Sequence, residues 1–287
     1  MRRITLGVCG TVAATLVLSA CGSGPSPDTT ASGHTLRAML PEHIRAAGVL
    51  KVGGSATVAP YLFYKGGGPA GMEKDLMNAL GEALGVRVHL SDIDFAGLVP
   101  ALQSQRIDVA MSDFTDSAER RQSVDFVDYT TSYSTLLVRG GNPGKLHSRD
   151  DLCGGSVAAT VGSTSQKLAE EQDTVCTDGG RKGIQVLRME NNPSTWTQVH
   201  TGRADAMLID FLIGQYVADQ GQGEVVGATF HKQFHGAAVR KDDTRLRKAL
   251  VAAFTQVMKD GTYIRILRKW KAERLAMSQP IVNASAS

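Results

Sequence analysis

Residues 107–128 read IDVAMSDFTDSAERRQSVDFVD and hold the transition on which the expected fold depends. The segment opens with the apolar run 107–111, which is short and β-branched enough to be a buried strand, and then turns abruptly polar. Asp116 and Glu119 have the spacing of a helix N-cap and its reciprocal acid, so we expect a helix to begin near Ser117. The pattern predicts a strand whose end leads directly into the start of a helix.

Such a junction would gather groups that suit a carboxylate. The free N–H groups of the turn, the Thr115 hydroxyl and the Arg120 guanidinium would share one small space. A helix start favours negative charge, and the planar fork of arginine matches two carboxylate oxygens. The alternative is that residues 119–121 form only a solvated helix face. The segment is therefore a candidate anion site, and taken alone it leaves both interpretations open.

The composition is that of an ordinary globular protein. The chain has 287 residues, of which 42% are hydrophobic and 21% are charged, and this length allows two lobes with substantial cores. Residues 1–20 contain two of the 31 Lys and Arg residues and none of the 28 Asp and Glu residues. Without them the chain is close to electrically neutral, which gives no support for nucleic-acid binding.

The first 21 residues have the pattern of an exported lipoprotein. Two arginines precede an apolar stretch and small residues, so residues 1–20 are predicted to be a signal peptide and not a membrane span. The sequence LSAC at positions 18–21 resembles a bacterial lipobox, which implies a lipid anchor on Cys21. The alternative is simple cleavage that leaves Cys21 as a spare thiol. Residues 21–44 are then expected to be a lipidated, flexible tether.

Two of the four cysteines remain for the folded part of the chain. Cys9 would leave with the signal peptide and Cys21 would carry lipid, so Cys153 and Cys176 form an even pair in an oxidising compartment. We expect a disulfide between them, which stabilises by about 3 kcal/mol on the chain-entropy model. Half of a metal site is the alternative, but no further ligands stand at suitable spacing.

Strands and helices alternate through the first half of the chain. The run 49–53 predicts a strand and 59–64 a second extended segment, whereas 72–84 has the apolar spacing of an amphipathic helix. A strand at 86–90 and a short helix at 95–103 lead to the strand of the opening segment. This order predicts a mostly parallel sheet, whose ligands collect beyond the carboxyl ends of its strands. The candidate site residues that follow such ends are Ser55, Val58, Phe95, Asp113 and Thr115.

The second half repeats this order of elements. Strands are expected at 157–160, 184–187 and 204–209, and helices after the polar turn 162–165 and at 193–200 and 211–219. A strand at 236–239 then precedes amphipathic stretches at 244–259 and 263–275. The economical interpretation is two α/β lobes of about a hundred residues each, with a ligand site between them.

Several short motifs, in their order and spacing, resemble one known family. They are LKVG at 50–53, Gly71 with Asp75 and Leu76, GLVPALQS at 97–104 with Ile107 and Asp108, Glu119 and Arg120 with VDF at 124–126, GST at 162–164, GRADA at 202–206, and DGTY at 260–263 with Trp270. The family is the extracellular solute-binding proteins, family 3, of bacterial ABC importers, whose members bind polar amino acids. The likeness covers residues 49–275.

The resemblance implies a periplasmic-binding-protein-like type II fold. Two α/β lobes with a two-strand hinge would close on a ligand in the cleft between them, which is a ligand-driven population shift. Lobe 1 would comprise residues 45–134 and 236–278, and lobe 2 residues 135–235 with the hinge strands at its edges. The protein would be the extracytoplasmic, lipid-anchored, monomeric binding component of an importer, with a membrane ABC permease as its partner.

The resemblance also assigns roles to individual residues. Arg120 and Thr115 would hold the α-carboxylate of the ligand, and Ser163 and Thr164 would donate to it from the second lobe. Asp210 follows an apolar run and would accept the α-ammonium. A zwitterion needs a cationic fork on one side and a carboxylate on the other, so these roles agree with the chemistry of the residues.

Three departures from the family pattern bear on the ligand. Val58 stands where an aromatic residue often stacks over the ligand, although Phe95 keeps the aromatic position on the other side. Ser55 stands where members that bind basic ligands tend to carry an acid. Asp113 replaces a small residue, and a second carboxylate beside Asp210 would be repelled unless a cation lies between them. We therefore expect a polar amino acid, and the sharper hypothesis is a cationic one held in part by Asp113. The alternative is that Asp113 only caps the next turn.

Other functions have weaker support. The chain contains no nucleophile elbow, zinc-protease motif or cysteine cluster, so no enzyme, cofactor or metal site is predicted. His231 and His235 are four apart and could share a helix face, but they lack a third metal ligand. One rival is a dehydratase on this fold, which would act on arogenate or prephenate with Asp113 or Asp210 as general acid. The other is a lipid-anchored sensor that presents its closed form to a membrane receptor.

Overall fold

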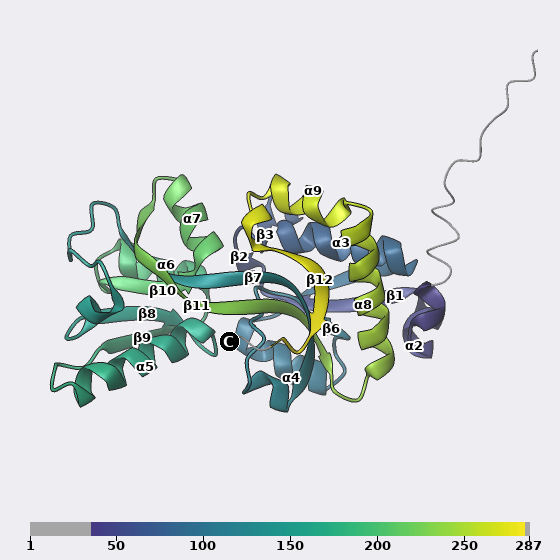
Figure 1. Cartoon of the computed structure of the whole chain (residues 1–287), viewed down its shortest axis with the longest axis horizontal. Coiled ribbons are helices and arrows are strands. Elements are labelled where there is room, and N and C mark those ends of the chain that lie inside the picture. Colours follow the sequence, from purple (N-terminus) through teal and green to yellow (C-terminus); the bar gives the residue numbers. More distant parts are fainter. Residues whose placement is uncertain (1–35, 285–287) are drawn as a thin grey trace, which may run out of the picture.

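The computed structural model describes residues 36–284, and Figure 1 shows two α/β lobes joined by two long strands. These strands are β7 (Val124–Arg139) and β11 (Gly223–Arg240), which pair antiparallel and run from one lobe into the other. They contain 16 and 18 residues, well beyond the roughly 3–10 residues of most strands. The expected two-lobe fold with a two-strand connection is confirmed. The exact residue boundaries of the lobes stay a prediction, because the crossings fall inside β7 and β11.

One sheet continues through both lobes in the strand order β5-β1-β6-β11-β7-β10-β8-β9. The remaining strands of the first lobe are β1 (Val49–Gly54), β5 (Arg87–Asp92) and β6 (Val109–Ala110), and those of the second are β8 (Ser156–Thr160), β9 (Gln185–Met189) and β10 (Ala206–Asp210). β1 pairs parallel with β5 and β6, and β8 pairs parallel with β9 and β10. Each lobe therefore has the predicted parallel strands, whose carboxyl ends point toward the middle of the molecule.

Helices cover the sheet in both lobes (Figure 1). The first lobe has α2 (Glu42–Ala47), α3 (Met72–Leu84), α4 (Leu98–Gln103), α8 (Thr244–Lys259) and α9 (Thr262–Lys269), and the second has α5 (Thr164–Asp178), α6 (Asn192–His200) and α7 (Phe211–Asp219). The apolar stripe of α3 is buried against α8 and α9, with Met72, Leu76 and Leu84 completely inaccessible to solvent. None of the helices within residues 36–284 is both long and apolar enough to cross a membrane.

A second, small antiparallel sheet follows β1. It consists of β2 (Thr57–Val58), β3 (Leu62–Lys65) and β4 (Gly68–Ala70). Gly66 and Gly67 connect β3 to β4 with φ angles of 63° and 84°, which side chains rarely adopt. The glycine run is therefore the turn of a hairpin between β3 and β4.

The helix expected near Ser117 does not form. Only a short 3₁₀ helix, Arg120–Gln122, stands there. Asp116 caps no helix, because its side chain is buried and ion-paired with Arg121 at 3.3 Å. The Ser117 hydroxyl instead accepts a hydrogen bond from the Arg120 N–H at 3.2 Å. The chain enters β7 at Val124, which leaves too little length for even two turns of α-helix.

The C-terminal part also differs from the expectation. The predicted amphipathic stretch 263–275 is helical only as far as Lys269, and a 3₁₀ helix, Glu273–Leu275, follows. The chain then forms β12 (Ala276–Val282), which pairs antiparallel with β7. Arg121 donates hydrogen bonds to the carbonyls of Asn283 and Ala284 at 3.0 and 2.9 Å. The segment from β12 to Ala284 therefore packs across β7 in the first lobe (Figure 1).

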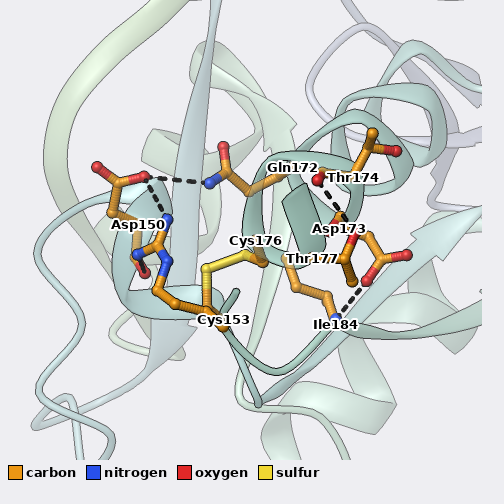
Figure 2. The surroundings of a disulfide bond; sticks show 9 residues. Asp150, Cys153, Gln172, Asp173, Thr174, Cys176, Thr177 and Ile184 are labelled. Atoms are coloured by element: carbon orange, nitrogen blue, oxygen red, sulfur yellow. Dashed lines mark hydrogen bonds and ion pairs between the residues drawn. A yellow bond between two sulfur atoms is a disulfide. The ribbon is translucent and has the colours of Figure 1, made fainter. Parts of the chain in front are cut away.

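The predicted disulfide between Cys153 and Cys176 is present, with the two Cα atoms 5.6 Å apart. Figure 2 shows that it ties the segment before β8 to α5. Hydrogen bonds flank it on both sides: the Gln172 amide donates to Asp150 at 3.2 Å, and the Ile184 N–H donates to Asp173 at 2.6 Å (Figure 2). Residues 1–20 and Cys21, on which the signal-peptide and anchor predictions depend, lie outside the described residues.

Candidate functional site

A cleft between the lobes gathers the predicted site residues. One part of it is a partly enclosed pocket that residues of both lobes line. Its lining comprises Ser55, Thr57, Val58, Phe95, Ser112, Asp113, Thr115, Thr160, Ser163, Thr164, Ser165, Asn191, Asn192, Met207, Leu208, Ile209, Asp210 and Gln233. Arg120, the remaining predicted residue, lines the adjoining part of the cleft. Thr115, Ser163, Thr164 and Gln233 border both parts, so the two form one continuous site.

Arg120 connects the two lobes. Its guanidinium donates to the Thr115 carbonyl at 2.8 Å and, across the cleft, to the Gly162 carbonyl at 2.9 Å. It also lies over the rings of Phe95 and Phe114, with its central carbon 5.3 and 4.4 Å from their centroids. Burial lowers the pKa of Arg120 to about 10, which still leaves it charged at neutral pH. Three of its five N–H groups remain for a ligand carboxylate among the described residues.

The second lobe supplies a helix N-terminus beside Arg120. Ser163 is the N-cap of α5, and its hydroxyl oxygen accepts from the Gln166 N–H at 3.1 Å. The Ser163 hydroxyl hydrogen is therefore available to donate into the cleft. Thr164 is the first residue of the helix and borders the same space. The unpaired N–H groups and the dipole of a helix start favour a negative charge here.

Asp210 stands at the end of β10, where it caps α7. One oxygen accepts from the Tyr61 hydroxyl at 3.0 Å and from the Leu212 N–H at 2.9 Å. The other accepts from the Ser132 hydroxyl and from the Gln233 amide at 3.3 Å. Burial and the Asp210 charge hold the pKa of Tyr61 well above its ordinary value, so Tyr61 stays a neutral donor. The Asp210 carboxylate is thus held in one orientation, with one face on the cleft.

Asp113, a predicted site residue, pairs with the deeply buried His235, which was not expected at this position. Asp113 has a left-handed backbone with φ of 52°, and its N–H donates to Glu73 at 2.8 Å. Its carboxylate lies 3.0 Å from Nδ1 of His235, while Nε2 of the same ring lies 3.7 Å from Asp210. Burial raises the pKa of Asp113 to about 8, against the opposing effect of His235. Burial by itself would lower the pKa of His235. The neighbouring carboxylates Asp113, Asp210 and Glu73 outweigh this effect and raise that pKa to about 9.

The structure corrects the sequence hypothesis about the histidines. His231 and His235 lie on strand β11 and share no helix face, and only His235 is buried. Among residues 36–284, the one group of three possible metal-ligating side chains is Asp113, Asp210 and His235. The two ring nitrogens of His235 face different carboxylates, so a single ion could not take both contacts. This arrangement suits a protonated ring better than a metal.

The remaining predicted residues form the walls of the cleft. Val58 is buried, and the Ser55 hydroxyl is 3.0 Å from that of Thr57. Phe95 packs edge-to-face against Phe114, with ring centroids 5.4 Å apart. Sequence reasoning missed several lining or supporting residues, namely Tyr61, Ser132, Asn191, Asn192, Gln233 and His235. The available signal was a polar residue next to a predicted strand, since His235 stands directly before the run 236–239.

Comparison with known proteins identifies the family. Residues 50–273 match the bacterial extracellular solute-binding proteins, family 3, and the chain belongs to this family. It is 30% identical over 231 residues to the L-cystine-binding protein TcyJ of Escherichia coli, covering 79% of this chain and 84% of the relative. It is 28% identical over 254 residues to the arginine-binding protein ArgT of Corynebacterium glutamicum, covering 86% and 82%.

Solved structures show the same fold. A mutant of ArgBP from T. maritima matches with a TM-score of 0.74 at 29% identity, covering 81% of this chain and 99% of that one. The ancestral amino acid-binding protein AncCDT-1, a precursor of cyclohexadienyl dehydratase, matches with a TM-score of 0.73 at 34% identity, covering 82% and 99%. The fold is therefore that of the type II periplasmic binding proteins.

Proposed function

We propose that this protein binds an amino acid between its lobes as the extracytoplasmic substrate-binding component of an ABC importer. The observation that carries the proposal is the distribution of charge in the cleft. Arg120 and the N-terminus of α5 border one part, and Asp210 borders the other. This arrangement complements a zwitterion. The cystine- and arginine-binding relatives support an amino acid as the ligand class.

The proposed contacts follow from this geometry. Arg120 and Thr115 would hold the α-carboxylate, with Ser163 and Thr164 donating from the second lobe. The α-ammonium would approach the cleft-facing side of Asp210. The ligand side chain would then extend along a wall that contains Ser55, Val58, Phe95 and Asp113. Closure would let both lobes contact one ligand, which neither lobe could do alone.

Thermal unfolding of the purified protein against single amino acids tests the proposal. A ligand at a hundred times its dissociation constant adds about 2.7 kcal/mol, which raises the midpoint by several degrees in a protein of this size. Arg120→Lys keeps the charge but loses the planar fork, so we expect affinity to fall by about tenfold or more. Arg87→Lys, an exposed residue of β5, is the control. If no amino acid shifts the midpoint, the proposed function is wrong.

We also propose export and a lipid anchor on Cys21, with a membrane permease as the receiving partner and a monomer as the assembly. The support is the lipobox-like sequence at positions 18–21 and the extracellular character of the family. Labelling with a radioactive fatty acid should mark the wild-type protein in its native membrane. Cys21→Ala should abolish the label, and a label that persists in this variant would contradict the anchor.

A dehydratase is the second candidate, because one observation favours it. Burial raises the pKa of Asp113 to about 8, so this cleft residue could serve as a general acid at neutral pH. AncCDT-1, a precursor of a dehydratase, has the same fold. Incubation with prephenate or arogenate, followed by chromatography, separates the two functions. A binding protein returns these compounds unaltered, whereas a dehydratase converts them.

A lipid-anchored sensor would use the same closing lobes, with a membrane receptor in place of the permease. Uptake of labelled ligand by cells separates it from an importer component. Deletion of the gene should abolish uptake in the importer case and leave it unchanged in the sensor case.

A further inference from the structure

Asp113 is a second carboxylate in the cleft beside Asp210, and a cation between the two would offset their repulsion. His235 lies at this position. Its side chain is completely buried between Asp113 and Asp210, at nitrogen-to-oxygen distances of 3.0 and 3.7 Å. It lies in β11, where its backbone forms an isolated bridge with Thr115. Its ring meets Tyr61 edge-to-face, with the centroids 5.6 Å apart. Packing therefore holds the ring in place behind the cleft surface.

The charge state of the ring follows from its neighbours. A neutral imidazole has one N–H and one lone pair, so one of the two carboxylates would face a lone pair. An imidazolium carries an N–H on both ring nitrogens, so its positive charge faces both carboxylates and removes this repulsion; the contacts are ion pairs, because neither nitrogen has hydrogen-bond geometry. Glu73 is a third acid nearby, but burial raises its pKa, and its Oε1 accepts from Tyr129 and Asp113. Glu73 does not line the cleft.

The pair of Asp113 and His235 therefore presents no net negative charge to a ligand. If the pair holds one proton, its net charge is zero in either arrangement, and if it holds two, the net charge is +1. Asp210 then remains as the anion for the α-ammonium, and Arg120 as the cation for the α-carboxylate. The balance leaves neither Asp113 nor Asp210 free for a second positive charge on the ligand.

We propose that His235 is a specificity-determining residue, an internal counter-ion for Asp113 that tunes the cleft to amino acids with uncharged polar side chains. This inference rests on the proposed function and narrows its ligand class. The lining around these two residues agrees with it, because Asp113 and Asp210 are the only charged residues within 36–284 in the part of the cleft that they border, whereas Arg120 and other charged residues line the adjoining part. Hydroxyl and amide groups line the wall instead, from Thr57, Thr160, Asn191 and Asn192.

The first test measures the ligand ranking of the wild-type protein. Isothermal titration with L-glutamine, L-asparagine, L-serine and L-threonine is compared with L-arginine, L-lysine and L-ornithine. We expect at least one uncharged ligand to bind more tightly than every cationic one, by about tenfold or more. If a cationic amino acid binds best, this inference is wrong and the proposed function stands. If none binds, both are wrong.

The second test changes the counter-ion. His235→Gln keeps a hydrogen-bonding side chain but leaves two carboxylates without their cation. We expect the affinity for cationic ligands relative to uncharged ones to rise by about tenfold. Adding Asp113→Asn to this variant removes the surplus charge and should return the ratio to near the wild-type value. His89→Gln, an exposed histidine of β5, should leave the ratio unchanged.

The affinity for cationic ligands relative to uncharged ones distinguishes a role of His235 in specificity from a role in stability. If His235 only supports the fold, His235→Gln weakens all ligands equally and leaves the ratio at its wild-type value, which overturns the inference. If this variant does not fold, the wild-type ranking still decides, because it needs no substitution. A ranking led by uncharged amino acids supports the inference, and one led by cationic amino acids rejects it.

Discussion

Asp210 combines two functions in one side chain, because the same carboxylate caps α7 and borders the cleft. Its oxygens accept from Tyr61, Ser132, Gln233 and the Leu212 N–H. These donors fix the carboxylate before any ligand arrives, which lowers the entropy lost on binding. A substitution here should therefore change both affinity and stability.

We predict that Asp210→Asn weakens ligand binding by about 100-fold, because an amide cannot pair with the α-ammonium as a carboxylate does. The free energy of unfolding should fall by about 1–3 kcal/mol, since one buried acceptor becomes a donor facing other donors. Calorimetric titration and thermal unfolding measure the two effects. Asp243→Asn at the N-cap of α8 is the matched control, because it alters a cap away from the cleft. Unchanged affinity in Asp210→Asn would contradict the proposed role.

The buried acid and histidine should also make stability depend on pH. The pKa of His235 is about 9 in the folded protein against 6.5 normally, so its contribution is complete below pH 6.5 and is lost as pH rises through 9. The raised pKa of Asp113, about 8, acts in the same direction, because the unfolded chain loses this proton at much lower pH. We predict that the unfolding midpoint falls steadily between pH 6.5 and 9.

Thermal unfolding across this range, with the double variant Asp113→Asn and His235→Gln as control, measures the effect. Each extra proton bound by the folded state contributes about 1.4 kcal/mol per pH unit. Burial also raises the pKa of Asp128 to about 8, so the slope in the double variant should decrease without vanishing. Equal slopes in the two proteins would show that the pair does not titrate in this range.

The site residues were predictable where they follow strand ends in sequence. Ser55, Asp113 and Asp210 each stand just beyond an apolar run, and the structure places all three on the cleft. His235 and Gln233 come from the middle of β11, and they reach the site because of register shifts in its pairing with β7. A one-residue change of register turns a side chain to the other face, and periodicity cannot supply that information.

At the scale of elements, three helices have the bounds that their apolar spacing predicted, whereas the predicted stretch 263–275 is helical only as far as Lys269. The structure has α3, α7 and α8 with the expected bounds, because a helical apolar period over many residues has no strand alternative. The helix near Ser117 did not form because the Asp116 side chain is buried and ion-paired with nearby Arg121, and the Asp116 N–H donates to the carbonyl of Phe234 in distant β11. β12 was missed because Ala276–Val282 has neither strong alternation nor high β-propensity.

The disulfide should stabilise the second lobe without taking part in binding. Cys153 and Cys176 are 23 residues apart, and a loop of this size predicts a loss of about 3 kcal/mol when the bond is removed. The double variant Cys153→Ala and Cys176→Ala should therefore unfold at a lower denaturant concentration. Ligand affinity should change little, because neither cysteine lines the cleft. Chemical reduction of the wild type should reproduce the effect, and unchanged stability would contradict it.

At the scale of the whole molecule, the strand and helix order was sufficient to predict two lobes. The resemblance implied two connecting strands, but only the short run 236–239 was predicted as a strand from its pattern, whereas β7 and β11 contain 16 and 18 residues. Both strands lie partly in the cores and partly between the lobes, so their burial pattern changes along their length. No single period describes such a strand, and its full extent is visible only in the fold.

The contact between Arg120 and Gly162 should influence how far the lobes open. It joins the first lobe to the turn before α5 at 2.9 Å. We predict that Arg120→Ala increases the radius of gyration of the ligand-free protein, because the lobes lose this direct link. Small-angle X-ray scattering measures the change. Arg181→Ala, which removes a bond to the Asp150 carbonyl within the second lobe, should leave the radius unchanged. Equal radii of gyration in the wild type and both variants would show that the contact between Arg120 and Gly162 does not limit how far the lobes open.

The chain enters and leaves the second lobe at two positions that lie next to each other. Arg139 at the end of β7 and Gly223 at the start of β11 are paired across the sheet, so the segment 140–222 begins and ends side by side. A recombination event that replaces this segment would exchange one half of the binding site and preserve the other. The new segment would supply Ser163, Thr164 and Asp210 together, whereas the rest of the original chain would supply Arg120 and His235. New ligand preferences can thus arise in this fold by exchange of the single segment 140–222.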